Sequence, residues 1–233
     1  MEHILITGSN RGIGYNLVKQ LLSQDCLIFA TCRNPASADE LNQLAAQSNG
    51  KIQIIPLDLD DEASIQQAFQ QVSVQVDHLD LLINNAGINP KTHRSLEDVT
   101  TEIMLDVFRV NAVAPLLITR QFLPLLKNGH NPRVINVSSQ VGSMTWKKSG
   151  GSYPYAASKA ALNMVTRCLA GDLGPEGITV ITLHPGWVQT NMGGDAADLK
   201  PEESAAMLMT LINRITRADN GKFYKWTGEE HPW

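Results

Sequence analysis

Several features that define common protein classes are missing from this chain. No apolar run approaches the roughly 18 residues that span a bilayer, and too few apolar residues precede Gly8 for a signal peptide. The net charge of −4 over 233 residues means that the chain lacks the overall positive charge that favours binding to nucleic acid or to an anionic membrane. These absences predict a cytoplasmic protein that binds neither nucleic acid nor membranes.

Cysteine and histidine lack the patterns that redox or metal chemistry needs. The three cysteines form no CxxC pair, and a low, odd count favours a reducing compartment and inert thiols over a reactive one. They are Cys26, Cys32 and Cys168. The six histidines show no ligand spacing such as HExxH, so the sequence predicts no metal site. They are His3, His78, His93, His130, His184 and His231.

Short aliphatic runs alternate with helical patterns along almost the whole chain. Strands are expected at 3–7, 26–32, 51–57, 79–84, 133–138, 178–184 and 222–226. Helices are expected at 12–23, 61–76, 100–127, 153–172 and 201–216. This alternation predicts an α/β fold, with a doubly wound, mostly seven-stranded parallel sheet covered by helices on both faces. No repeat or long linker divides the chain, so residues 1–233 are expected to form a single-domain Rossmann fold.

The glycine-rich segment TGSNRGIG, residues 7–14, follows the first expected strand and opens the first expected helix. A helix start offers unpaired N–H groups and a positive dipole end, which together attract phosphate. Gly8 permits a tight turn, and Gly12 and Gly14 let the backbone approach a pyrophosphate. The Gly-Lys-Ser/Thr of a P-loop is absent. For this loop alone, a glycine-rich turn without a ligand is the alternative.

Four further motifs follow the later strands. They are NNAG at 84–87, the serine pair at 138–139, YAASK at 155–159 and PGWVQT at 185–190. Together and in this order, over the whole chain, the motifs resemble those of the short-chain dehydrogenase/reductase family. The segment HPGWVQTNMGG at 184–194 and the terminal PW at 232–233 are most similar to sniffer-type and C-factor-like carbonyl reductases.

Tyr155 and Lys159 lie one helical turn apart and share a helix face, although a surface Tyr–Lys pair has the same spacing. The ammonium is expected to lower the pKa of the phenol, so that Tyr155 exchanges a proton with a carbonyl or alcohol oxygen. Ser139 can align that oxygen by a hydrogen bond, and the resemblance implies that this second serine of the pair is the catalytic one, with Ser138 structural. The resemblance implies that Lys159 also binds the nicotinamide ribose. It also implies that Asn111 kinks its helix and holds a proton-relaying water, whereas an ordinary helix-interior Asn is the alternative.

The gap between Ser139 and Tyr155 is longer than in many family members. Its surplus falls in TWKKSGG at 145–151, which is expected to overhang the substrate pocket. A solvated loop with its lysines outward is the alternative. Three neighbouring apolar residues either line the pocket or belong to the core: Met144, Trp187 and Met192.

The resemblance also assigns residues to the cofactor. Asn84, Ala86 and Gly87 are expected to wall its riboses. Asp58 is expected to contact adenine, or else to cap a helix, and Thr190 to hold the carboxamide. The full expected set is Gly8, Asn10, Arg11, Gly12, Ile13, Gly14, Arg33, Asp58, Leu59, Asn85, Ala86, Gly87, Tyr155, Lys159, Pro185, Gly186, Val188 and Thr190.

Two arginines indicate which dinucleotide binds. NAD-preferring relatives carry an acid at the end of the second strand, where it binds the ribose hydroxyls. Here Cys32 takes that place and Arg33 follows it. Arg11 and Arg33 can flank a 2′-phosphate, an anion whose geometry suits guanidinium groups. The sequence therefore predicts NADP, with NADPH preferred over NADH.

The expected activity is NADPH-dependent reduction of a small-molecule carbonyl, with Asn111, Ser139, Tyr155 and Lys159 as the catalytic set. A dinucleotide-binding sensor or signalling protein without turnover is the alternative from another class. A sugar-nucleotide epimerase or dehydratase shares YxxxK, but only a short segment follows Thr190.

The helices expected at 113–127 and 153–172 carry apolar residues around much of their circumference. One side of each can cover the sheet, and the other is left for a partner. The sequence therefore predicts a homodimer through these helices, with a tetramer left open. A monomer that covers the excess apolar area with its own loops is the alternative.

Overall fold

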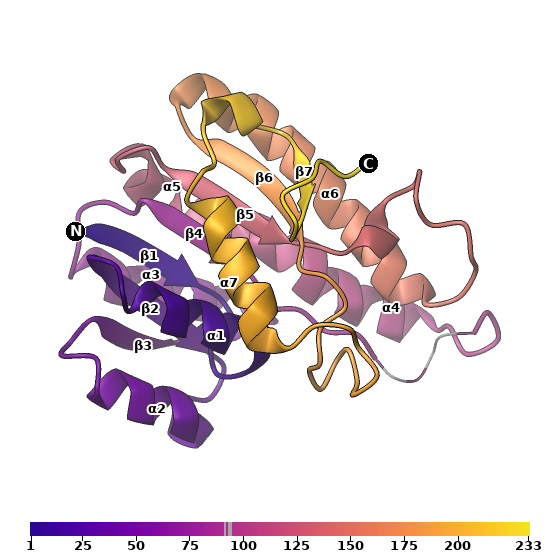
Figure 1. Ribbon diagram of the computed structural model, residues 1–233, viewed down its shortest axis with the longest axis horizontal. Coiled ribbons are helices and arrows are strands. Elements are labelled where there is room, and N and C mark those ends of the chain that lie inside the picture. The colour runs from indigo at the N-terminus through magenta and orange to yellow at the C-terminus, as the bar shows by residue number, and fades with distance from the viewer. Residues whose placement is uncertain (91, 93–94) are drawn as a thin grey trace.

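The computed structural model describes residues 1–90, 92 and 95–233, and within them the strands form one seven-stranded sheet (Figure 1). The strand order is β3-β2-β1-β4-β5-β6-β7, and every pairing is parallel. The strands are β1 (Glu2–Ile6), β2 (Cys26–Cys32), β3 (Ile52–Pro56), β4 (Leu81–Asn84), β5 (Arg133–Val137), β6 (Thr179–His184) and β7 (Phe223–Lys225). The predicted doubly wound parallel sheet is thereby confirmed. His93 lies outside the described residues.

Helices cover both faces of the sheet, as predicted. The α-helices are α1 (Gly12–Leu21), α2 (Asp39–Ala46), α3 (Glu62–Ser73), α4 (Thr101–Phe108), α5 (Ala114–Lys127), α6 (Tyr153–Leu173) and α7 (Pro201–Ile212). Shorter helical turns are η1 (Pro35–Ser37), η2 (Arg109–Val113), η3 (Gln140–Gly142), η4 (Gly174–Glu176) and η5 (Arg217–Asp219). The core cluster on one face joins the sheet to α1, α2 and α7, and the other joins it to α3, α5 and α6.

Strand β1 shows why successive residues in the strands of this sheet are aliphatic. Ile4 and Ile6 pack into the core on one face, whereas Leu5 packs into the core on the other. Successive side chains of a strand point to opposite faces, and a parallel sheet covered on both sides therefore needs apolar residues at every position.

Two elements differ from the sequence prediction. Helix α2 was not predicted, because Leu41 is its one buried residue and its other positions carry little apolar pattern. The helix predicted at 100–127 is interrupted between α4 and α5 by η2, a turn of π-helix that contains the buried Asn111. A π turn inserts an extra residue and is a common feature of functional sites. The π turn lies at the position where the family resemblance implied a kink.

The direction of strand succession reverses at β1, which pairs with β2 on one side and β4 on the other. In sheets of this kind a ligand binds outside the carboxyl ends of the strands at the reversal point. The loops after β1 and β4 therefore lie where a ligand is expected. Among the described residues, no helix is both long enough and apolar enough to cross a membrane.

Candidate active site

Three loops that follow different strands meet at the carboxyl edge of the sheet. Gly8 has a φ of +69°, and a Cβ there would lie 2.9 Å from the Cβ of Ala86, just after β4. Gly12 has a φ of +58°, and its Cβ would lie 3.3 Å from Cγ2 of Thr190, beyond β6. Both positions favour glycine on conformational and on steric grounds. We call the loop predicted to bind phosphate, together with the segments around Ala86 and Thr190 that it contacts, the glycine cradle.

The first turn of α1 is open to a ligand. Arg11 occupies the N-cap position in extended conformation, and no side chain caps the helix. Helix N-termini with free N–H groups bind anions through those groups and the helix dipole. A Cβ at Gly14 would lie 2.2 Å from the carbonyl oxygen of Gly8, so the turn tolerates only glycine. The backbone here fits a dinucleotide pyrophosphate.

Thr7 and Asn85 fix the glycine loop against the loop after β4. The Thr7 hydroxyl oxygen accepts the backbone N–H groups of Asn85 and Ala86, at 3.0 and 3.1 Å. The Asn85 side-chain amide donates to the carbonyl oxygens of Thr7 and Gly8, at 2.9 and 3.2 Å. Sequence analysis missed the positioning role of Thr7, although the residue lies in the segment quoted for the glycine loop.

The prediction for Asn84 was wrong. Its side chain is 2% exposed and does not wall a cofactor site. It donates instead to Asn136 at 2.9 Å, and Asn136 donates to Thr166 at 2.9 Å. These hydrogen bonds join β4, β5 and α6 and hold the Asn84 side chain inside the protein.

Ser139 and Tyr155 meet at the end of β5. Ser139 precedes η3, and its hydroxyl oxygen accepts the N–H of Val141 at 3.3 Å. Burial raises the pKa of Tyr155 to about 12, an effect that a hydrogen bond with Ser139 partly offsets. The half-buried phenol is therefore protonated at neutral pH. Ser138 is buried, with its hydroxyl 3.4 Å from the carbonyl oxygen of Lys159.

Lys159 is buried beside the ring of Tyr155. The Lys159 ammonium donates to the carbonyl oxygen of Val137 at 2.8 Å and lies 5.8 Å from the centre of the Tyr155 ring. Burial lowers the pKa of Lys159 to about 8. The net pKa of Tyr155 lies above the usual value of a phenol and not below it as expected, because burial of the phenol is the largest effect.

Asn111 connects the loop after β4 to α6. Its side-chain oxygen accepts the N–H of Ile88 at 2.8 Å, and its amide donates to the carbonyl oxygen of Ile88 at 2.8 Å and to Ser158 at 3.0 Å. A Cβ at Gly87 would lie 3.1 Å from the Asn111 side-chain oxygen and 3.5 Å from the Lys159 nitrogen. The structure thus brings the four residues of the predicted catalytic set to one end of the glycine cradle.

Arg11 and Arg33 are exposed, Arg11 at the start of α1 and Arg33 directly after β2. In the described part of the chain, neither forms an ion pair, so both guanidinium groups are available to an anion. Asp61, not Asp58, caps α3, and the Asp58 carboxylate accepts the N–H of Asp60 at 3.1 Å. Cys32 is buried, and burial raises the pKa of its thiol.

The segment after β6 has a fixed path beside the cradle. Val188 is buried and pairs with Leu199, and the Thr190 hydroxyl oxygen accepts the N–H of Gly193 at 3.1 Å. Gly186 has a φ of +88°, and a Cβ at this position would lie only 2.5 Å from the side chain of Leu199. Pro185 precedes it, with its carbonyl oxygen accepting the Ser204 hydroxyl at 2.7 Å.

Large apolar side chains are exposed on the loops beyond β5 and β6. Met144 is 80% exposed, Trp187 47% and Trp146 45%, so Met144 and Trp187 are not core residues. The Lys147 ammonium bonds to the carbonyl oxygens of Ser149 and Gly150, at 2.7 and 3.2 Å, within the loop itself. This loop is anchored at its start, where the buried Ser143 donates to the carbonyl oxygen of Pro232 at 2.6 Å.

This fold and cradle define a doubly wound α/β protein of the dinucleotide-binding class. The family model described as short chain dehydrogenase matches residues 2–200. The chain belongs to the short-chain dehydrogenase/reductase family, as the resemblance predicted, which makes it an oxidoreductase by family.

Solved structures of carbonyl reductases are similar over the full chain. The NADPH-bound carbonyl reductase from chicken fatty liver is 37% identical with a TM-score of 0.93, and the match covers 100% of this chain and 99% of that one. The carbonyl reductase Sniffer of D. melanogaster is 37% identical with a TM-score of 0.94, with full coverage of both chains.

A curated relative carries a name from a different functional class. C-signal of Myxococcus xanthus is 42% identical over 155 residues, a match that covers 66% of this chain and 93% of that protein. The short-chain dehydrogenase srdF of Neurospora crassa is 33% identical over 248 residues, covering 99% of this chain and 97% of that protein. The chain is thus similar both to a relative named as an enzyme and to a relative named as a signal.

Proposed function

We propose that this protein is an NADPH-dependent carbonyl reductase that converts small ketones or aldehydes into alcohols. The observation that carries the proposal is the position of Tyr155 and Ser139 at the end of β5, beside Lys159 and the glycine cradle. A protonated phenol, an alcohol donor and an ammonium at one site suit proton delivery to a carbonyl oxygen.

The unpaired Arg11 and Arg33 support NADPH as the cofactor. Guanidinium groups bind phosphate in bidentate geometry, and no acid ends β2 to bind a free 2′-hydroxyl. The chicken carbonyl reductase was solved with NADPH, and one from Pseudomonas aeruginosa with NADP. Asp58, Leu59, Asn85, Ala86 and Thr190 remain the residues proposed to line the rest of that site.

When bound, the cofactor supplies the hydride for reduction. Tyr155 donates the proton to the carbonyl oxygen, and Ser139 orients that oxygen by a hydrogen bond. Lys159 supplies positive charge beside the phenol as it loses its proton. Asn111 holds the loop at Ile88 and the helix at Ser158, so that Gly87 and Lys159 stay adjacent.

A screen of NADPH consumption against a panel of aliphatic, aromatic and dicarbonyl substrates tests the proposal. We expect at least one substrate to be turned over by the wild-type protein and not by Tyr155→Phe. Cofactor binding by fluorescence titration serves as the control. The similarity to C-signal keeps a signalling protein as the competing function, which predicts NADPH binding with no turnover across the panel.

We also propose a cytoplasmic homodimer formed through α5 and α6. The three cysteines are free, as expected in a reducing compartment. Met164 on α6 is 65% exposed and Leu116 on α5 is 37% exposed, so apolar area remains on these helices after folding. Light scattering should give twice the chain mass, with Met164→Glu monomeric. Val74→Glu changes an exposed apolar residue elsewhere and should stay dimeric, and a monomeric wild type would contradict the proposal.

A further inference from the structure

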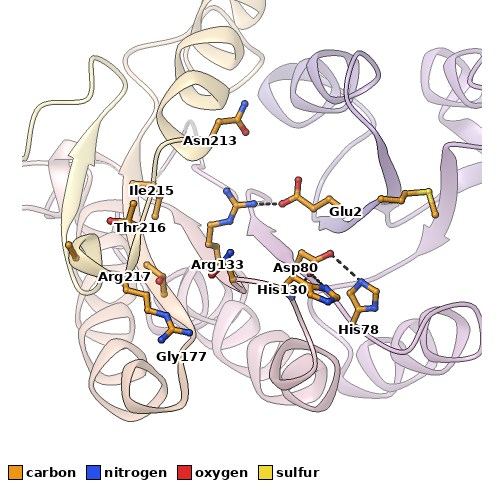
Figure 2. Close-up of a pocket in the computed structure, with 14 residues that line it drawn as sticks. Glu2, His78, Asp80, His130, Arg133, Gly177, Asn213, Ile215, Thr216 and Arg217 are labelled. Atoms are coloured by element: carbon orange, nitrogen blue, oxygen red, sulfur yellow. Dashed lines mark hydrogen bonds and ion pairs between the residues drawn. The ribbon is translucent and has the colours of Figure 1, made fainter.

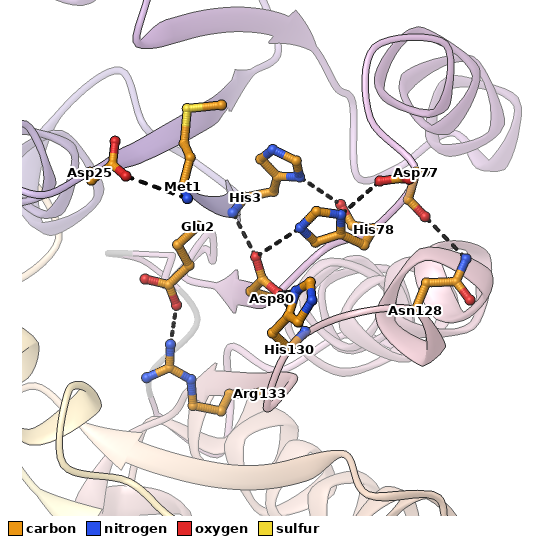
Figure 3. A network of polar contacts seen from close by, with 10 residues as sticks. All are labelled: Met1, Glu2, His3, Asp25, Asp77, His78, Asp80, Asn128, His130 and Arg133. Atoms are coloured by element: carbon orange, nitrogen blue, oxygen red, sulfur yellow. Dashed lines mark hydrogen bonds and ion pairs between the residues drawn. The ribbon is translucent and has the colours of Figure 1, made fainter.

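A second cluster of chemically active side chains lies at the amino edge of the sheet, opposite the glycine cradle (Figure 3). His3 is the second residue of β1, and Asp80 immediately precedes β4, the strand that pairs with β1. His78 lies in the connection from α3, and His130 in the connection from α5 to β5. Parallel pairing brings together residues that are far apart in sequence.

Asp80 is the fixed centre of this cluster. Its side chain is 4% exposed. One carboxylate oxygen accepts the N–H of His3 at 2.8 Å, and the other accepts the N–H of His130 at 2.6 Å. These two bonds hold the carboxylate in one orientation. The oxygens also face two imidazoles, with Nε2 of His78 at 3.5 Å and Nδ1 of His130 at 3.6 Å.

The charge on Asp80 has no permanent cationic partner. Among the described residues, its ion pairs are with histidines alone. The nearby Arg133 is paired with Glu2 (Figure 2). A buried carboxylate is costly unless a positive charge matches it. A bound cation would supply that charge.

The imidazole of His78 is oriented as a metal ligand. Its Nδ1 lies 2.7 Å from a carboxylate oxygen of Asp77. With Nδ1 donating its hydrogen, Nε2 of the neutral ring presents its lone pair toward Asp80. A carboxylate that fixes the tautomer of a histidine from behind is the usual outer-shell partner of metal-binding imidazoles.

We propose that His3, His78 and Asp80 bind a divalent transition metal of the zinc type, with His130 as the fourth ligand. One potential ligand atom from each of the first three residues lies within 4.8 Å of the others. Tetrahedral zinc, with bonds of about 2.0–2.2 Å to nitrogen and oxygen, needs its ligands roughly 3.3 Å apart. Binding therefore requires a short closing movement of the side chains.

The His130 side chain can complete the ligand set, and the adjoining cavity gives a metal ion a path to it. The His130 side chain is 82% exposed, and its ring meets the His78 ring edge-on with 5.0 Å between centres. His78, Asp80 and His130 line a cavity of about 1070 Å³ that opens at this edge (Figure 2). An exposed ring can rotate onto a metal that enters through the cavity. The bound metal would then join the start of β1 to two connecting loops.

Zinc titration of the tag-free, chelator-treated protein tests this proposal without cofactor or substrate, and so independently of the reductase function. The chain used carries Cys168→Ser, because this exposed thiol would compete for zinc. Calorimetry should give one zinc per chain with micromolar or tighter affinity. Thermal unfolding should shift upward with zinc, since a ligand specific to the folded state stabilises it.

Three variants assign the binding to the cluster. His78→Ala and His130→Ala should each weaken zinc binding at least tenfold, and His130→Ala changes an exposed side chain, so its fold should be intact. Asp25→Asn, an exposed carboxylate near the same edge, should bind as the wild type does. Absence of saturable zinc binding, or unchanged affinity in both histidine variants, would overturn the proposal.

Discussion

The carboxyl edge and the amino edge of the sheet are products of the same parallel pairing, but they carry different chemistry. At the carboxyl edge, Gly8 approaches Ala86, Gly12 approaches Thr190, and Gly87 approaches Lys159. At the amino edge, three imidazoles surround the buried Asp80. A parallel sheet gathers like ends of its strands, so each edge concentrates whatever the adjoining connections contain.

The two edges also differ in how far the sequence predicts them. Residues of the carboxyl edge occur in short segments directly after strands, such as TGSNRGIG and YAASK, so the order of segments is informative. Residues of the amino edge enter singly, and 75 positions separate His3 from His78. Only strand pairing reveals that cluster, because no ligand spacing along the chain brings its members together.

The same contrast explains the other differences between prediction and structure. Strands were predicted because both faces of the sheet demand apolar residues, whereas α2 rests on the single buried Leu41. Asn84 was misassigned because its bonds to Asn136 and Thr119 depend on two distant elements. The protonation of Tyr155 and Lys159 depends on burial, which the spacing between them does not encode.

The largest effect is expected at the carboxyl edge, on removal of the Tyr155 hydroxyl. Tyr155→Phe keeps the ring and its packing but loses the proton donor, and general acid catalysis contributes about 10²–10⁴-fold to rate. Steady-state assays should show carbonyl reduction lowered by that factor, with NADPH affinity within twofold of wild type. Turnover at the wild-type rate would remove Tyr155 from the mechanism.

Cofactor choice should change when both arginines are removed. Charge-assisted hydrogen bonds contribute about 1.5–3 kcal/mol each, so Arg11→Ala with Arg33→Ala should weaken NADPH at least tenfold. NADH, which lacks the 2′-phosphate, should bind nearly as before. Fluorescence titration with both cofactors provides the comparison. Equal affinity of the wild type for NADPH and NADH would contradict the role assigned to these arginines.

A smaller effect is expected from pH. Burial lowers the pKa of Lys159 to about 8, so its ammonium is present below that pH and is lost as the pH rises through it. Loss of the charge beside Tyr155 should lower the initial kcat for reduction above pH 8. In Lys159→Arg, which stays protonated because its pKa exceeds about 12, any residual activity should lack this decline. A flat wild-type profile between pH 7 and 9.5 would exclude this role for Lys159.

The smallest effect on carbonyl reduction is expected from a substitution at the amino edge of the sheet. His130 is exposed and lies at the opposite end of the strands from Tyr155. His130→Ala should therefore leave kcat/KM for carbonyl reduction within twofold of wild type. A tenfold loss in this variant, with the fold intact by circular dichroism, would show that the two edges are coupled.

Hydride transfer to a carbonyl carbon is the central claim, and an isotope label tests it most directly. The protein is incubated with NADPH deuterated at C4 of the nicotinamide and with a carbonyl substrate, and the product is analysed by mass spectrometry. We predict an alcohol with one deuterium on the former carbonyl carbon when the labelled face is the transferred one, and therefore assay both C4 epimers. Tight NADPH binding with no labelled alcohol from either epimer, across the substrate panel, would contradict the account and favour a signalling protein.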